Sequence, residues 1–304
     1  MEPVTIRSYH TLFQSAREVP LYANPWWLEA TCGVGGWDAL IRYDSAQKPV
    51  GGIPFQRSRI RGLTAITTPP MTQWVSLLSG ENDSKEENSF TLSDLPKASI
   101  LDLSLKPDVR INLQEYPTAP ALKYSFIIPR ADDMKDVRAK YNEGLRRNLK
   151  QAGQLHSVEE SDNLAGFQKL CHQTYHDRDM QPPAWFDRIV PLVYKKLIAN
   201  QCGTLTLATA QGKIIAGILT AWDRYTTYYL AGGKTADDHG TAAHALLLDN
   251  AIQSACARGT SFDFEGSMHP GIANFFQSFG SVPVSYWNFK KYRGAGRIWA
   301  ALKR

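Results

Sequence analysis

The chain has 304 residues, of which 43% are hydrophobic and 21% charged, as in folded globular proteins and unlike disordered ones. Its net charge of +5 comes from the C-terminus, because no acidic residue follows Glu265. The six cations beyond that point are Lys290, Lys291, Arg293, Arg297, Lys303 and Arg304. The rest of the chain is nearly neutral, which excludes a protein coated with positive charge for binding DNA.

Other classes of protein are excluded by simple patterns. The N-terminus lacks the charged and apolar regions of a signal peptide. The longest apolar stretches, such as residues 242–248, are far shorter than the ~20 residues of a membrane helix. The four cysteines form no Cys-x-x-Cys pair, which favours reduced thiols over a disulfide framework or a zinc site. We therefore expect a cytoplasmic protein without a transmembrane segment.

Residues 1–130 predict a first α/β lobe. Helices are expected at residues 9–17 and from Pro25, with Asn24 as a cap. The polar segment 79–94 is expected to be a loop. Pro129 and the acidic turn after it mark the boundary of the lobe. Strands are expected at residues 37–43, 50–56, 100–103, 109–113 and 124–128.

Residues 131–304 predict a second lobe with a clearer pattern. Helices are expected at residues 135–152, 164–176, 185–200, 241–258 and 274–279. Strands are expected at residues 204–210, 213–222, 226–231, 262–264 and 282–289. Gln211 and Gly212 are typical of a hairpin turn between the first two strands. This order predicts a mixed α/β sheet.

The order hairpin, strand, loop, helix, strand resembles the core of the GNAT acyltransferases. Their Gln/Arg-x-x-Gly-x-Gly/Ala loop binds the pyrophosphate of coenzyme A at a helix N-terminus. The matching stretch here runs from Asp237, which stands where the family has Gln or Arg. The resemblance implies that Gly240, Thr241 and Ala242 would contact the cofactor.

Two other segments resemble FemAB-like proteins of the same superfamily. They are the basic helix at residues 143–152, and the strand at 262–267 with the helix that follows at 275–280. The resemblance covers about residues 135–293 and implies an α/β (mixed α+β) fold. It implies two GNAT-like lobes, each with a mixed central sheet flanked by helices. Some FemAB-like proteins transfer amino acids from aminoacyl-tRNA onto peptidoglycan precursors.

Asp263 and Glu265 are the candidate catalytic carboxylates. Two residues apart on a strand, they are expected to point to one face, while Phe262 and Phe264 face the core. Close carboxylates raise one pKa, which suits a general base for an attacking amine. The alternative is a hydrogen-bonded strand end, or carboxylates paired with an arginine. Gly266 and Ser267 are expected to turn the backbone beside a substrate, and they or Lys290 would stabilise the oxyanion.

Other side chains are candidates for binding substrate. Arg146, Arg147 and Lys150 would hold phosphates of the donor or acceptor, unless they form only a solvated face. The resemblance places Tyr175, Arg178 and Trp185 near the acceptor, and we expect Tyr229 and Tyr286 to reach the pocket. His172 and His176 have a possible metal spacing, but no third ligand is identifiable and we expect no metal.

The resemblance to these families thus implies an acyltransferase. An acyl or aminoacyl group would pass from an activated donor to an amine acceptor, such as a cell-wall or polysaccharide precursor. Acyl-CoA and aminoacyl-tRNA both stay open as co-substrates, without a tightly bound cofactor. The alternative is a non-catalytic GNAT-fold protein that binds a glycan, a peptide or a protein partner.

Overall fold

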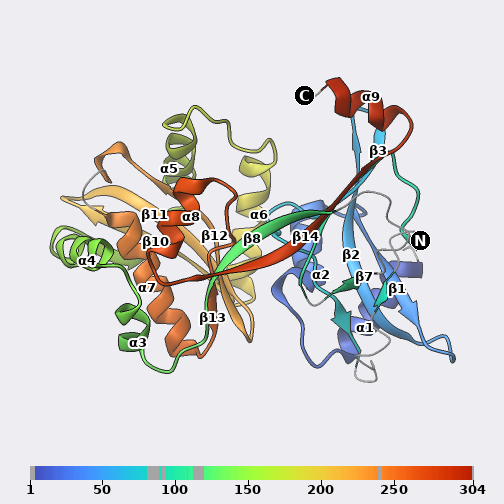
Figure 1. The fold of residues 1–304 in the computed structure, drawn as a ribbon, viewed down its shortest axis with the longest axis horizontal. Helices are drawn as coiled ribbons and strands as arrows, with labels where there is room; N and C mark the ends of the chain where they lie inside the picture. The colour runs from blue at the N-terminus through green and yellow to red at the C-terminus, as the bar shows by residue number, and fades with distance from the viewer. Residues whose placement is uncertain are drawn as a thin grey trace. The chain divides into compact units, whose positions relative to one another are not determined.

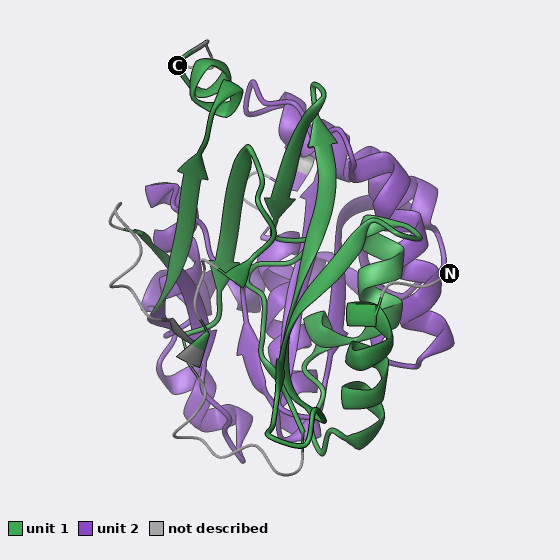
Figure 2. Ribbon diagram, turned by 90° about the vertical axis from the view of Figure 1, so that its right-hand side faces the viewer, with its two compact units in different colours: residues 1–123, 285–304 green, residues 124–284 purple. Residues whose placement is uncertain are grey.

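The computed structural model describes residues 4–80, 89–90, 94–107, 109–111, 120–238 and 242–302. It divides into two units (Figure 2): unit 1 comprises residues 1–123 and 285–304, and unit 2 comprises residues 124–284. The chain passes from unit 1 into unit 2 within β8 (Ala121–Ile128) and returns within β14 (Val282–Tyr292).

Residues 285–304 therefore belong to the same unit as the N-terminal part of the chain. The sequence pattern predicted them in the second lobe, residues 131–304. The reason is a strand pairing between distant segments. β14 is antiparallel to β6 (Ile100–Leu105), with Trp287 opposite Leu105 and Tyr292 opposite Ile100. The basic C-terminal segment is thus a strand and a helix, α9 (Ala295–Leu302), of unit 1.

Unit 1 has a mixed sheet in the order β1-β2-β3-β6-β14 (Figure 1). Neighbouring strands are antiparallel except for the parallel pair β3 and β6. Helix α1 packs on β1 and β2 and buries Tyr9 and Leu12 completely. The other elements are α1 (Val4–Ser15), η1 (Leu21–Ala23), α2 (Pro25–Cys32), β1 (Trp37–Tyr43), β2 (Pro49–Ile60), β3 (Leu63–Thr67), β4 (Leu78–Ser79), β5 (Ser89–Phe90) and β7 (Arg110–Ile111).

The strands of unit 2 follow the order β8-β13-β12-β11-β10-β9. Their pairs are antiparallel except for β12 and β13, which are parallel. Helices α5 and α6 pack on one face, and α7 packs on the other beside α4 (Figure 1). The strands are β9 (Ser157–Glu160), β10 (Gly203–Ala210), β11 (Lys213–Trp222), β12 (Thr226–Lys234) and β13 (Ser261–Asp263).

The helices of unit 2 are α3 (Met134–Ala139), α4 (Glu143–Leu155), α5 (Leu164–His176), α6 (Phe186–Ala199), η4 (Ala236–Asp238), α7 (Ala243–Arg258) and α8 (Pro270–Gln277). The single helix expected at residues 135–152 is in fact two, α3 and α4. Asn142 separates them because its side-chain Oδ1 accepts a hydrogen bond from Leu145 N at 2.7 Å and caps α4. Its own N–H donates to the Ser278 carbonyl at 2.9 Å, which ties the break to the end of α8.

The predicted mixed α/β fold is thus confirmed. Most of the expected strands and helices are present, with ends that differ by a few residues. Asn24 does precede α2, but its side chain donates to the carbonyls of Pro20 and Leu21 and does not cap the helix. Within the described ranges, none of the helices has the length and apolar character needed to cross a membrane.

Candidate functional site

The candidate site lies in unit 2, where β12 and β13 part. The two strands pair at only three positions, from Thr226 opposite Ser261 to Tyr228 opposite Asp263. β13 then ends, whereas β12 continues to Lys234. The register of β12 against β11 also shifts here, because Tyr229 pairs with Thr220 and Ala231 with Leu219. Leu230 is therefore the extra residue of a β-bulge, a feature that often lies beside active sites.

Tyr229 and His244 form a hydrogen-bonded pair at this bulge. The Tyr229 hydroxyl lies 3.1 Å from His244 Nε2, and the imidazole stacks on Phe275 of α8. Gly232 makes room for the pair, since a Cβ at this position would lie 2.2 Å from the Tyr229 hydroxyl oxygen. The helix predicted at residues 241–258 included His244, but no sequence signal connected it with Tyr229. Only the crossing of α7 over β12 brings them together.

Burial keeps both partners of this pair neutral. It lowers the pKa of His244 to about 4, although the nearby carboxylate of Asp238 opposes the shift. Burial also raises the pKa of the Tyr229 phenol. At neutral pH the pair is therefore an imidazole and an undissociated phenol, which together can pass a proton or hold a hydrogen bond to a carbonyl oxygen.

Arg178 is the cation beside the pair. Its charge opposes the raised pKa of Tyr229 and adds to the lowering of the His244 pKa, so it lies near both side chains. Arg178 is exposed and forms no ion pair with a residue in the described ranges. Tyr175 lies near Arg178 and contacts the ring of Phe186, as Trp185 does. The structure thus brings four predicted binding residues, Tyr175, Arg178, Trp185 and Tyr229, into one region of unit 2.

The N-terminus of α7 carries its own anion. Asp238 Oδ1 accepts a hydrogen bond from Ala243 N at 2.6 Å and a longer one from His244 N at 3.4 Å. Its Oδ2 forms an ion pair with Lys234 at 3.0 Å. A carboxylate of the chain therefore occupies two N–H donors of the kind that a pyrophosphate uses at a helix N-terminus. Ala242 precedes α7 with a left-handed φ of 56°. The other two predicted cofactor residues, Gly240 and Thr241, lie outside the described residues.

Asp263 is a hydrogen-bonded strand end. It is buried, and its Oδ1 accepts hydrogen bonds from the Ser125 hydroxyl and from Glu265 N at 2.8 Å. Burial raises its pKa to about 6, and these two bonds oppose the shift. The structure thus supports the alternative to a base role. Ser125 belongs to β8, so Asp263 fastens the end of β13 to the neighbouring strand.

Glu265 does not share a strand face with Asp263, because β13 ends before it. Its φ of 58° is left-handed, a conformation that costs about 1–3 kcal/mol in a residue other than glycine. Its Oε1 is enclosed and, among the described residues, has no hydrogen-bond partner. Burial, and not a neighbouring carboxylate, raises the pKa of Glu265 well above its usual range. A carboxyl group on a strained backbone, with one oxygen enclosed and unpartnered among the described residues, is a candidate for proton transfer.

Gly266 turns the backbone as expected, with a φ of 63°. The space beside it is filled by protein, however, and not left for a substrate. A Cβ on Gly266 would lie 2.2 Å from the Tyr124 carbonyl oxygen of β8. The Ser267 hydroxyl accepts a hydrogen bond from His269 N at 3.1 Å. Gly266 and Ser267 thus shape the turn after Glu265.

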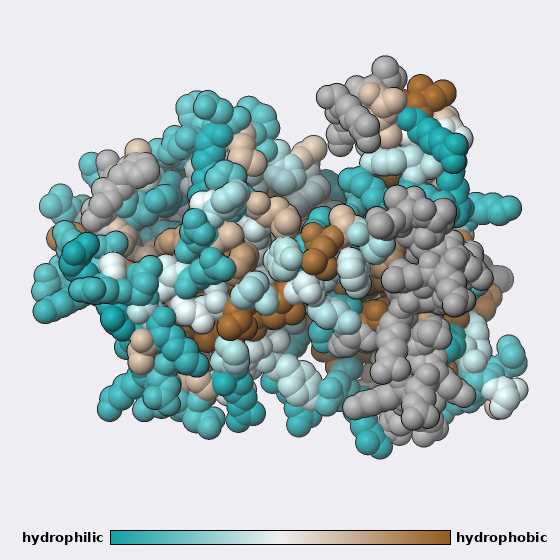
Figure 3. Space-filling view, in the orientation of Figure 1, coloured by the Kyte–Doolittle hydropathy of each residue, from teal (hydrophilic) through white to brown (hydrophobic). Residues whose placement is uncertain are grey.

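The three basic residues of α4 are exposed. Figure 3 shows hydrophilic residues gathered over this helix, which buries only Leu145 and Ala152. Arg146 donates to the Ala139 carbonyl at 3.2 Å. Within the described part of the chain, Arg147 and Lys150 form no hydrogen bond or ion pair with another side chain. Phosphate binding by the three residues stays a prediction.

Lys290 and Tyr286 belong to unit 1. Lys290 forms an ion pair with Asp102 at 2.8 Å, and Tyr286 packs edge-on against Trp74. Their roles in oxyanion stabilisation and substrate binding stay predictions. In unit 2, His172 Nε2 lies 2.6 Å from Asp187 Oδ1. Over the ranges that the structure covers, no group of three or more His, Cys, Asp or Glu residues is placed to hold a metal ion.

Comparison with known families identifies the domain that contains this site. Residues 135–275 match the family model of the acetyltransferase (GNAT) domain. The match covers this segment alone, which lies in unit 2 of the chain. By sequence, none of the curated proteins matches the chain.

Solved structures extend the likeness over the whole chain. The fold is similar to that of FemX, with a TM-score of 0.67 at 12% identity, covering 100% of this chain and 99% of FemX. It is similar to a C-terminal domain from Agrobacterium fabrum, provisionally named a lysylphosphatidylglycerol synthetase (TM-score 0.56, 10% identity, 98% and 96% covered). L-PGS from Bacillus licheniformis is also similar, with a TM-score of 0.53 at 9% identity, covering 94% of this chain and 91% of L-PGS. The expected FemAB-like, GNAT-superfamily resemblance is confirmed at the level of fold and domain.

Proposed function

We propose that this protein is an acyltransferase that moves an acyl or aminoacyl group from an activated donor to an amine. The observation that carries the proposal is the Tyr229–His244 pair at the bulge of β12, within the matched GNAT domain. A neutral imidazole and phenol at this position can act on an ester or thioester, which needs little more than orientation and proton transfer.

In the proposed reaction, Glu265 receives the amine. An approaching ammonium group would supply the partner that Glu265 Oε1 lacks. Because the pKa of Glu265 is raised, a proton passes readily from that nitrogen to the carboxylate. The free amine then attacks the acyl carbon, and the bond from that carbon to the donor's oxygen or sulfur breaks. Tyr229 donates a proton to the leaving atom, and His244 holds the phenol in place. The attacking nitrogen then gives up its second proton, which restores the Tyr229 phenol and completes the amide.

The cap of α7 favours an aminoacyl-tRNA over acyl-CoA as the donor. Asp238 already accepts from the N–H groups of Ala243 and His244, and its negative charge opposes a second anion there. The reacting ester of an aminoacyl-tRNA brings no pyrophosphate to this helix. As the FemAB-like resemblance implies, we propose an amine of a cell-wall precursor as the acceptor and the cytoplasm as the location.

A transfer assay with labelled donors tests the proposal. The protein is incubated with aminoacyl-tRNA or acyl-CoA and an amine-bearing, nucleotide-linked cell-wall peptide. Tyr229→Phe is expected to lower kcat by about 10²–10⁴ because it removes the proton donor. Tyr194→Phe is the control, since it removes a phenol that hydrogen-bonds the Ser161 carbonyl from α6. Equal rates for wild type and Tyr229→Phe would show that Tyr229 does not act as the proton donor.

The alternative, a non-catalytic binding protein, gives a different result in the same samples. It would bind the precursor in calorimetry but form no product with any donor. If acyl-CoA supports turnover and aminoacyl-tRNA does not, acyl transfer stands and the assignment of the donor is wrong.

A further inference from the structure

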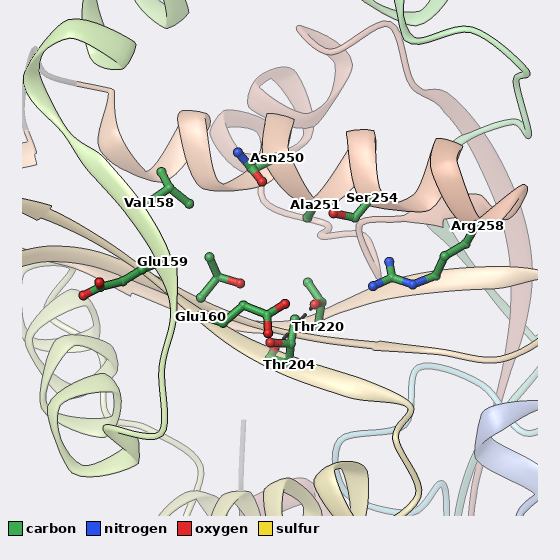
Figure 4. A pocket seen from close by; sticks show the side chains of 10 residues that line it. Val158, Glu159, Glu160, Thr204, Thr220, Asn250, Ala251, Ser254 and Arg258 are labelled. Atoms are coloured by element: carbon green, nitrogen blue, oxygen red, sulfur yellow. Dashed lines mark hydrogen bonds between the residues drawn. The ribbon is translucent and has the colours of Figure 1, made fainter.

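A polar pocket of about 120 Å³ lies between α7 and strands β9, β10 and β11 of unit 2 (Figure 4). From α7 it is lined by Asn250, Ser254 and Arg258, which are four residues apart and therefore share one helix face. From the strands it is lined by Glu160, Thr204 and Thr206, among others.

This pocket is distinct from the site at Tyr229 and His244. His244 is at the start of α7 and Arg258 is its last residue. At ~1.5 Å of rise per residue, the two Cα atoms are roughly 20 Å apart along the helix axis. Binding in this pocket therefore does not depend on the proposed transferase reaction.

The pocket is polar and open to solvent, since Glu160, Asn250 and Arg258 are exposed. β10 presents Leu205 and Leu207, both buried, to the face opposite α7, and Thr204 and Thr206 to the pocket. Valine would fill the same space as threonine without a hydroxyl. In the part of the chain that the structure describes, no hydrogen bond engages the side chains of Thr204, Thr206, Glu160, Asn250 or Ser254. Their donors and acceptors are available to a polar ligand.

Arg258 provides a fixed positive charge at one end of the pocket. Its guanidinium carbon lies 3.8 Å from the centre of the Trp222 ring, a cation–π contact that holds the side chain. No described residue accepts a hydrogen bond from it. Figure 4 shows the guanidinium reaching into the pocket towards Glu160, whose carboxylate influences it electrostatically. The pocket therefore carries one charge of each sign.

This arrangement selects a class of ligand. A simple anion would be attracted by Arg258 and repelled by Glu160, and a simple cation would experience the reverse. A small zwitterion satisfies both groups, with its carboxylate on the planar fork of Arg258 and its ammonium group on Glu160. We propose that this pocket is a second ligand site, which binds a free α-amino acid with a small side chain.

The size of the pocket supports this class. One water molecule needs about 10–15 Å³ measured in the same way, so 120 Å³ admits a ligand of several heavy atoms but not a nucleotide or a sugar chain. The hydroxyls of Thr206 and Ser254 would favour a ligand with a further polar group. We expect serine and alanine to bind better than leucine or phenylalanine.

Isothermal titration of the full chain with alanine, propionate, ethylamine and inorganic phosphate tests the proposal. Alanine should show saturable binding, and the three single-charge probes should bind at least about tenfold more weakly. Arg258→Met and Glu160→Gln should each weaken alanine binding by about 10- to 100-fold, since each removes a charged hydrogen-bonding group. Arg258→Lys keeps the charge and should give an intermediate loss.

Matched controls separate the pocket from general charge effects. Arg224→Met removes an arginine that also stacks on an aromatic ring, that of Tyr225, but lies outside the pocket lining, and it should leave binding unchanged. Thermal melting of each variant confirms folding. The proposal is overturned if no amino acid binds, if propionate or phosphate binds as well as alanine, or if Arg224→Met and Arg258→Met act alike.

Discussion

The Tyr229 hydroxyl lies 3.1 Å from His244 Nε2, although the two residues are fifteen positions apart in the chain. Tyr229 is at the bulge of β12 and His244 is in the first turn of α7, so the strand, the loop and the helix together set this distance. The pair lies where β12 and β13 separate, and its rings contact Phe275 and Phe276 of α8. Two ionisable groups near the point where β12 and β13 separate, His244 and Asp263, should make the stability of the protein depend on pH.

His244 should make the protein less stable in acid. Its pKa is about 4 in the folded protein, against an ordinary value of 6.5, so the unfolded chain binds more protons between these values. This contribution to stability is complete above pH 6.5 and is lost as pH falls to about 4, by on the order of 3 kcal/mol. Urea unfolding at several pH values should show that His244→Gln lacks this contribution. A parallel profile for wild type and variant would contradict the assignment.

Asp263 should act in the opposite direction. Burial raises its pKa from 3.8 to about 6, so its contribution to stability is present below pH 3.8 and is lost as pH rises to 6. Asp263→Asn keeps an acceptor for Ser125 and Glu265 N but cannot ionise. Relative to this variant, the wild type should lose on the order of 3 kcal/mol between pH 4 and 6. Because the two windows overlap with opposite signs, only the single variants reveal them.

Gly266→Ala should destabilise the fold strongly. The added Cβ would lie 2.2 Å from the backbone oxygen of Tyr124, at a φ of 63°. Gly212→Ala is the matched control, since Gly212 has a φ of 75° but open space around it. The control should cost about 1–2 kcal/mol for the left-handed backbone alone, and Gly266→Ala at least about 4 kcal/mol. Equal losses in chemical unfolding would show that β8 does not constrain this turn.

Arg138→Met should also destabilise unit 2. Arg138 of α3 donates to both carboxylate oxygens of Asp249 in α7, and Tyr141 donates to the same group at 3.0 Å. Removing the arginine leaves the carboxylate buried with one neutral partner, at a cost of about 3 kcal/mol. Arg146→Met, on the exposed face of α4, should change the free energy of unfolding by less than about 0.5 kcal/mol. A similar change for both variants would show that the α3–α7 ion pair is not stabilising.

Local patterns in the sequence determined much of the secondary structure. α5 spans residues 164–176 as predicted, since its apolar spacing and the capping side chain of Asn163 are local signals. The β10–β11 hairpin also forms as expected, because alternating residues and the Gln211-Gly212 turn act over a few positions. The FemAB-like resemblance and the mixed α/β fold could likewise be inferred from segments a few residues long.

Only the tertiary structure decided how those segments combine. Asp263 and Glu265 do not share a strand face as expected, because β13 ends between them. There Ser125 of β8 hydrogen-bonds Asp263, and the Tyr124 carbonyl leaves no room for a Cβ on Gly266. The partner of β14 and the meeting of His244 with Tyr229 depend on contacts between residues far apart in the chain. Hydrophobic periodicity specifies which face of an element is buried, but the packing of distant elements decides what lies against that face.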